Sequence, residues 1–190
     1  TATTTANDNT AFGHAAARDT TTGSENTAVG RAALQVNTTG SNNTVLGSNA
    51  LIANTTASNN VAIGRRAMYG NTTGTANVAI GYQALYTNTT QSENVAIGYN
   101  ALYNAAGNNN TAVGNEAGEN MTTGYQNTCM GMRAGEELTT SYQTTAIGAY
   151  ALDDCTTGIK NTAVGWDAGG DVSTANHSVY IGTNAGDDHT

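Results

Sequence analysis

The sequence repeats itself every 17 residues, and this period constrains the fold more than any other feature. The stretch Asn77–Glu93 reads NVAIGYQALYTNTTQSE and is followed at once by NVAIGYNALY. Eleven such units occur, and only the unit Asn94–Asn109 is one residue short, with 16. The units begin at Asn9, Asn26, Asn43, Asn60, Asn77, Asn94, Asn110, Asn127, Thr144, Asn161 and Ser178. We therefore expect residues 1–190 to form a single repeat array, as a fragment of a longer one.

Each unit has the same order of residue types, and its places are numbered here 1 to 17 from the first residue of the unit. Place 1 is usually Asn, places 2 and 4 are β-branched or large and apolar, place 5 is always Gly and place 8 is always Ala. Stacked units would align each place in a column. The predicted structural columns include Asn26, Asn43, Asn60, Asn77 and Asn94; Gly30, Gly47, Gly64, Gly81 and Gly98; and Ala33, Ala50, Ala67, Ala84 and Ala101.

A unit of this length suits one coil of a β-solenoid, because helix pairs and propeller blades need about 33 to 50 residues. The β-branched and aliphatic residues at places 2 to 4 favour a strand, and the following Gly ends it. The chain contains no proline, in agreement with a backbone whose N–H groups are used in ladders. We predict an all-β fold, a parallel β-solenoid of about eleven 17-residue coils that are stacked about 4.8 Å apart.

The short unit and the conserved order of places give finer expectations. The missing residue of Asn94–Asn109 falls after the NVAIG segment, so the strand should keep its register. The Asn at place 1 is expected to form a ladder of hydrogen-bonded amides along the stack. The Gly at place 5 is expected to permit a positive φ, or a close backbone approach, at a corner.

Side chains at places 2 and 4 share one face of the expected strand, and place 3, mostly Ala, takes the other. Both faces are apolar, as in strands that are buried on both sides. The small Ala face either packs on another wall of the same coil or packs laterally against identical chains. We favour the lateral packing.

Composition and motifs argue against several classes of function. Only 11% of residues are charged, and the net charge of −8 arises almost entirely from residues after Asn109. The sequence has no basic patch of the kind that binds nucleic acid. It also has no apolar run long enough to predict a membrane span. Cys129 and Cys155 lack metal-ligand spacing, and the chain has neither a hydrolase nor a metalloprotease motif. We predict a protein that is not an enzyme and needs no cofactor or metal.

Two kinds of polar or aromatic column offer possible binding surfaces. Thr38, Thr55, Thr72 and Thr89 recur at place 13, and rows of threonine also occur on ice-binding β-solenoids. Tyr69, Tyr86 and Tyr103 recur at place 10 in three consecutive units, where exposed rings could bind a glycan. The alternatives are a turn for the threonines and a stiffening aromatic ladder for the tyrosines, and we favour these structural roles.

The recurring core N-[TV]-A-[VI]-G-x-x-A resembles the head repeats of trimeric autotransporter adhesins of the YadA type. The longer unit NTAVGRAALQVNTTGSN is similar to arrays in phage tail fibres. The resemblance covers essentially the whole chain, although adhesin heads commonly use shorter units. It implies a left-handed parallel β-roll, a homotrimer, and a location outside the cell, on a virion fibre or on the cell surface.

These observations predict a non-enzymatic structural segment of a phage-type tail fibre or surface adhesin, a stiff rod for attachment or receptor presentation. A host-surface glycan or a protein would be the receptor. One alternative is the subunit of an extracellular filament, a homopolymer in which coils stack end to end through their exposed edges. The other is an ice- or glycan-binding module that uses the Thr or Tyr columns.

Overall fold

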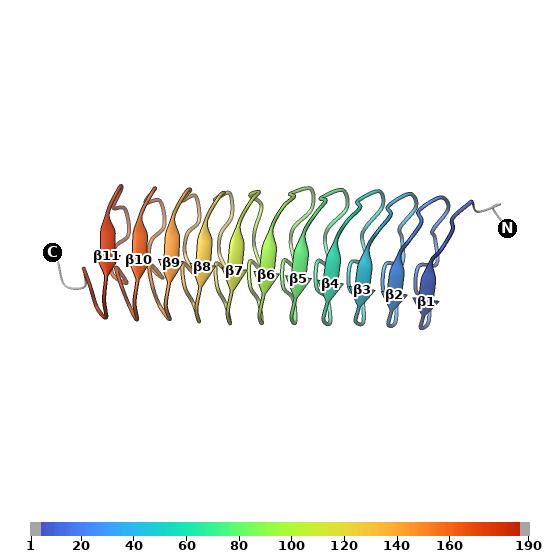
Figure 1. The fold of residues 1–190 in the computed structure, drawn as a ribbon, viewed down its shortest axis with the longest axis horizontal. Coiled ribbons are helices and arrows are strands. Elements are labelled where there is room, and N and C mark those ends of the chain that lie inside the picture. Colours follow the sequence, from blue (N-terminus) through green and yellow to red (C-terminus); the bar gives the residue numbers. More distant parts are fainter. Residues whose placement is uncertain (1–4, 187–190) are drawn as a thin grey trace.

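The computed structural model describes residues 5–186 as an elongated stack of coils (Figure 1). Each coil contributes one strand of three residues at places 2 to 4, and the described part of the chain contains no helix. The strands are β1 (Thr10–Phe12), β2 (Thr27–Val29), β3 (Thr44–Leu46), β4 (Val61–Ile63), β5 (Val78–Ile80), β6 (Val95–Ile97), β7 (Thr111–Val113), β8 (Thr128–Met130), β9 (Thr145–Ile147), β10 (Thr162–Val164) and β11 (Val179–Ile181).

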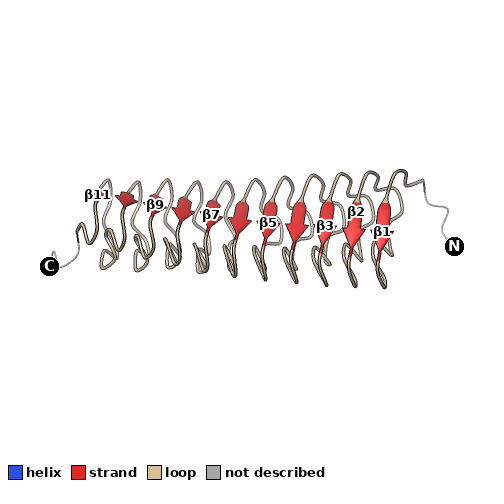
Figure 2. Ribbon diagram, turned by 60° about the horizontal axis from the view of Figure 1, so that its bottom comes forward, coloured by secondary structure: helices blue, strands red, loops and turns tan. Residues whose placement is uncertain are grey.

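All eleven strands form one parallel sheet in sequence order, which confirms the predicted parallel β-solenoid. Equivalent places pair throughout, as in Val78 with Val95 and Ile80 with Ile97. The register also survives the short coil, because Val95 pairs with Thr111. Figure 2 shows the strands aligned along the stack, with long loops closing each coil. The left-handed winding stays a prediction.

The interior of the solenoid is lined by small residues, and this corrects the expectation for the Ala face. Ala62 in β4 and Ala79 in β5 are 0% exposed within the single chain. Their place-3 side chains pack in one core cluster with the alanines of place 8 and the large residues of place 9, such as Leu85. Lateral packing of other chains against the Ala face is therefore wrong. The face that points outward carries places 2 and 4 instead.

The large side chain at this end of the core stands at place 9 in some coils and at place 12 in others, and the residue at the other place is small. Where place 9 is Leu85, place 12 is the small polar Asn88, and both are fully buried. Where place 9 is Gly118, place 12 is the buried Met121. A Cβ added to Gly118 would lie 3.3 Å from the Met121 Cε atom, so the methionine fills the space that a leucine would occupy. The coils that begin at Asn26 to Thr144 thus each hold one large side chain at this end of the interior.

The corner at place 5 needs glycine for two reasons. Gly81 has a φ of +141°, which side-chain-bearing residues rarely adopt. A Cβ on Gly81 would also lie 2.2 Å from the carbonyl oxygen of Gly98 in the next coil. The backbones of successive coils therefore approach too closely at this corner for any side chain.

We expect Gly81→Ala to lower the free energy of unfolding by about 3 kcal/mol or more, because strain at positive φ and overpacking against backbone add together. Gly70→Ala is the matched control, since Gly70 has no positive φ. A Cβ atom added to Gly70 would lie 3.1 Å from its nearest neighbour, the Tyr86 carbonyl oxygen. Gly70→Ala should cost less than about 1 kcal/mol. Equal losses for the two variants in urea denaturation would contradict this account of the corner.

Candidate functional site

The asparagines of place 1 form a buried ladder that joins each coil to the next. The Oδ1 atom of Asn60 accepts the backbone N–H of Asn77 at 2.9 Å, and the Oδ1 atom of Asn77 accepts that of Asn94 at 3.0 Å. The Nδ2 group of Asn77 donates to the Gln91 carbonyl within its own coil at 2.9 Å. One side chain therefore satisfies a buried donor of the next coil and an acceptor of its own loop.

A second buried asparagine column lies at place 12, and the sequence interpretation missed it. The Nδ2 group of Asn54 donates to the Asn37 Oδ1 atom at 2.8 Å and to the Ala57 carbonyl at 3.0 Å. The column runs from Asn37 through Asn54 and Asn71 to Asn88, and the equivalent place in the next coil is Ala105. The Asn88 Oδ1 atom is accordingly left without a hydrogen-bond partner. The recurrence of Asn before four consecutive Thr-Thr pairs, from Thr38-Thr39 to Thr89-Thr90, was the available signal.

The threonines of place 13 use their hydroxyl groups inside the stack. The Thr38 hydroxyl donates to the Thr55 carbonyl at 2.8 Å, and the Thr72 hydroxyl donates to the Thr89 carbonyl at 3.0 Å. Each of these hydroxyl protons is therefore committed to the adjacent coil. The place-13 column acts as a third ladder along the rod, alongside the strands and the asparagines.

The tyrosines of place 10 stack on one another. The ring centroids of Tyr69 and Tyr86 lie 5.1 Å apart, and those of Tyr86 and Tyr103 lie 5.0 Å apart, with nearly parallel planes. The Arg66 guanidinium lies 5.9 Å from the Tyr69 centroid. The ring faces between coils thus cover each other, and a sugar that needs an open aromatic face meets mainly ring edges.

Trp166 at place 6 differs from these tyrosines. It is 50% exposed and meets Tyr150 edge to face, with centroids 6.3 Å apart. The Arg133 guanidinium lies 5.5 Å from the Tyr150 centroid. This aromatic pair belongs to the acidic half of the molecule and leaves part of an indole ring in contact with solvent.

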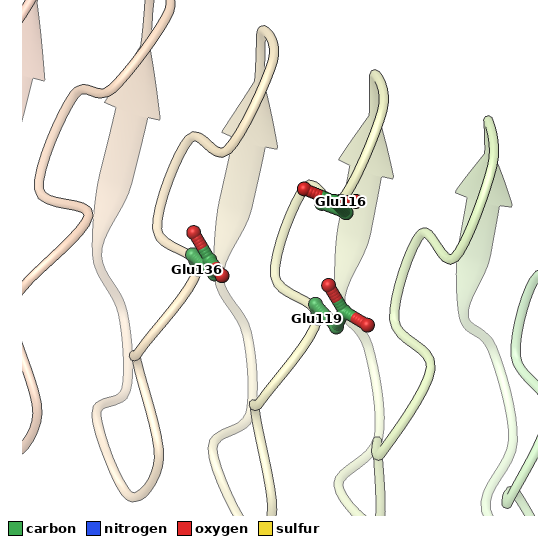
Figure 3. A group of neighbouring side chains, drawn as sticks. All are labelled: Glu116, Glu119 and Glu136. Carbon is green, nitrogen blue, oxygen red and sulfur yellow. The ribbon is translucent and has the colours of Figure 1, made fainter.

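Three carboxylates gather on the loops after β7 and β8 (Figure 3). Oxygen atoms of Glu116, Glu119 and Glu136 lie within 4.8 Å of one another, so they form a set that a hard cation could contact. Glu136 is also the ion-pair partner of Arg133. Partial burial, with the nearby charge of Glu116, raises the pKa of Glu119, and Asn100 donates a hydrogen bond to it at 3.0 Å. The cluster concentrates negative charge, and the single guanidinium of Arg133 offsets only part of it.

Asp153 lies in the following coil and continues this acidic surface. Burial raises the pKa of Asp153 to about 6, and the charges of Asp154 and Asp167 add to the effect. The carboxylate form of Asp153 is therefore disfavoured in the folded state. Ionisation of Asp153 therefore lowers the stability of the fold.

Comparisons with protein-family models, with curated proteins and with solved structures found no match for the chain. Within residues 5–186, no helix long and apolar enough to span a membrane is present. The geometry of the columns themselves must therefore support any functional proposal.

We expect Asn77→Ala to lower the free energy of unfolding by about 2–3 kcal/mol, because the buried N–H of Asn94 loses its acceptor. Asn77→Thr should cost less, since Thr144 occupies the same column and its hydroxyl accepts the N–H of Asn161 at 3.5 Å. Thermal and urea unfolding of the two variants would measure the difference. If the Thr variant were as unstable as the Ala variant, a side-chain acceptor for the Asn94 N–H would not contribute to stability, contrary to this prediction.

The raised pKa of Asp153 predicts a pH dependence of stability. A carboxyl whose folded pKa exceeds its unfolded value stabilises the protein fully below the unfolded value of about 3.9, and this stability is lost as pH rises through about 6. The melting temperature should therefore fall between pH 4.5 and about pH 7. Asp153→Asn should flatten this slope. An unaltered slope in Asp153→Asn would contradict the assignment.

Proposed function

We propose that the chain is a non-enzymatic structural segment of a phage-type tail fibre or a surface adhesin. It is a stiff rod that spaces or presents a receptor-binding part outside the cell, on a virion fibre or a cell surface. The observation that carries this proposal is the unbroken, in-register stack of eleven equivalent coils. At about 4.8 Å per coil, such a stack extends roughly 50 Å.

The stiffness follows from several parallel ladders rather than from one. Strand pairing joins the coils on one wall, for example between β5 and β6. The place-1 asparagines, directly before the strands, and the place-13 threonines of the loops add further hydrogen bonds between coils. Bending the rod would strain these hydrogen bonds, because the place-1 amides adjoin the strand wall and the place-13 hydroxyls join the coils in the loops. A rod of this kind transmits force and holds its ends apart.

The columns that suggested ligand binding support the rod instead. The place-13 hydroxyls donate hydrogen bonds to carbonyls of the neighbouring coil, and the place-10 rings stack on one another. These contacts give the Thr and Tyr columns a structural role without ice or a glycan. An end-to-end filament remains an alternative proposal, as does a glycan or protein receptor for a complete fibre. A homotrimer or homopolymer is the assembly that we propose.

A change in the number of coils tests the rod directly. Three extra copies of Asn77–Glu93, inserted after Glu93, should lengthen the particle by about 14 Å in small-angle X-ray scattering, at about 4.8 Å per coil. The melting temperature should not fall, because each added coil brings its own ladders. In the control insert, the residues equivalent to Asn77 and Gly81 are alanine, and the particle should become less regular. An unchanged length for the intact insert would refute the rod.

A further inference from the structure

The contact between the coil Asn77–Glu93 and the short coil Asn94–Asn109 lacks hydrogen bonds that the other coils make. We call this contact the short-coil junction. The Ala106 carbonyl, at place 13 of the short coil, accepts no hydrogen bond within residues 5–186. The other place-13 carbonyls each accept a backbone N–H from the coil before them; they belong to Thr21, Thr38, Thr55, Thr72, Thr89, Thr122, Thr139, Thr156 and Ser173.

The asparagine column of place 12 ends at the same junction. The Nδ2 group of Asn88 donates to the Asn71 Oδ1 atom at 2.8 Å. The Oδ1 atom of Asn88 has no partner of its own, although the residue is fully buried. Place 12 of the short coil is Ala105, which has no amide group to donate. Both loop ladders, at places 12 and 13, are therefore interrupted at this one junction.

Gln91 supplies, from within its own coil, the acceptor that the short coil does not provide. Its Oε1 atom accepts the N–H groups of Thr89 at 3.2 Å and Thr90 at 3.1 Å. One coil earlier, the N–H groups of Thr72 and Thr73 donate to the Thr89 carbonyl of the next coil instead. Place 15 is Gly, Ala or Ser in every other coil, so this substitute occurs only here. The loop before the short coil therefore satisfies its own donors.

The rest of the short-coil junction is closed. Strands β5 and β6 pair in full register. On one border of the loop gap, the Thr87 N–H donates to the Tyr103 carbonyl at 3.0 Å. On the other border, the Ser92 N–H donates to the Asn108 Oδ1 atom at 2.8 Å. The gap in the hydrogen bonding is thus confined to places 12 to 15.

We infer that the short-coil junction is a joint built into the rod, at which the loops at places 12 to 15 move apart while the strand wall stays closed. No hydrogen bond joins residues 88–91 to residues 105–107, so their separation breaks none. Separation also lets water reach the Asn88 Oδ1 atom, a buried acceptor that has lost its hydration without gaining a donor. In a stack of repeats, stability is a sum over neighbouring contacts, and opening concentrates at the weakest one.

The joint gives the rod a preferred direction of bending. A wider gap at places 12 to 15 tilts the coils on its two sides away from the side of the rod that carries these places. The contacts at places 11 and 16 limit the tilt, because they border the gap and stay bonded. This motion is a property of the coils themselves and does not depend on the proposed role in a fibre.

Hydrogen exchange of the unchanged protein, resolved by NMR, tests whether this junction opens first. The N–H groups of Thr89 and Thr90 should exchange at least about ten-fold faster than those of Thr72 and Thr73, which occupy the same places one coil earlier. Equal rates for the two pairs would overturn the inference.

Spin labels test whether the opening bends the rod. Labels at Thr73→Cys and Thr123→Cys lie on either side of the joint, and labels at Thr22→Cys and Thr73→Cys lie on one side of it. All three positions are exposed at place 14, and each pair is three coils apart, about 14 Å. The native thiols are buried. In electron paramagnetic resonance, the pair across the joint should show a distance distribution about two-fold broader and shifted to longer distances. Equal distributions would overturn the inference.

Repair of the loop is the matched control. Replacement of Ala106 by Thr-Thr, combined with Gln91→Gly, restores the missing place and removes the substitute acceptor. The Thr89 and Thr90 amides should then exchange within about three-fold of their equivalents one coil earlier, and the two label pairs should give equal widths. A broad distribution that persists in the repaired protein, with its fold verified by circular dichroism, would overturn the inference. If the repaired chain does not fold, the measurements on the otherwise unchanged chain decide. A rod that lengthens with added coils but shows no joint would refute only this inference and leave the proposed function standing.

Discussion

The solenoid depends on one recurring interaction, the side-chain carbonyl of a buried asparagine that accepts the backbone N–H of the next coil's first residue. A strand of only three residues offers few ladder bonds of its own. The place-1 amide adds a bond at the start of each strand and ties the returning loop to it through Nδ2. Because both contacts are buried, leaving either unmade would be costly. The coils therefore keep nearly equal lengths, since equivalent place-1 residues must lie one above another.

The narrow interior is the second consequence of such short strands. Alanine at places 3 and 8 lets the two walls approach, and one large residue at place 9 or place 12 fills the remaining space. The same compactness forces the backbone into positive φ at places 5, 7, 9 and 17, where residues such as Gln83 and Leu85 adopt it without being glycine. The strain at these corners persists because ladders on both sides hold it in place.

Periodicity alone predicted the fold class, the strand positions and the parallel register, because each depends only on which places recur. It did not predict which strand face points inward, since Ala at place 3 and Val or Ile at places 2 and 4 are both apolar. It also missed place 12, where Asn54 and Met121 share a buried position although their chemistry differs. The Thr and Tyr columns were found, but their use inside the stack depends on hydroxyl and ring geometry that no sequence pattern contains.

The most direct test of this account is hydrogen exchange of the place-1 backbone amides, resolved by NMR. If the asparagine ladder joins the coils, the N–H groups of Asn60, Asn77 and Asn94 should exchange as slowly as the strand amides beside them. The amides of exposed Arg65 and Tyr99 at place 6, which donate no hydrogen bond within the described residues, should exchange faster. Exchange of the place-1 amides at the rate of the exposed loops would show that the ladder does not hold the coils together.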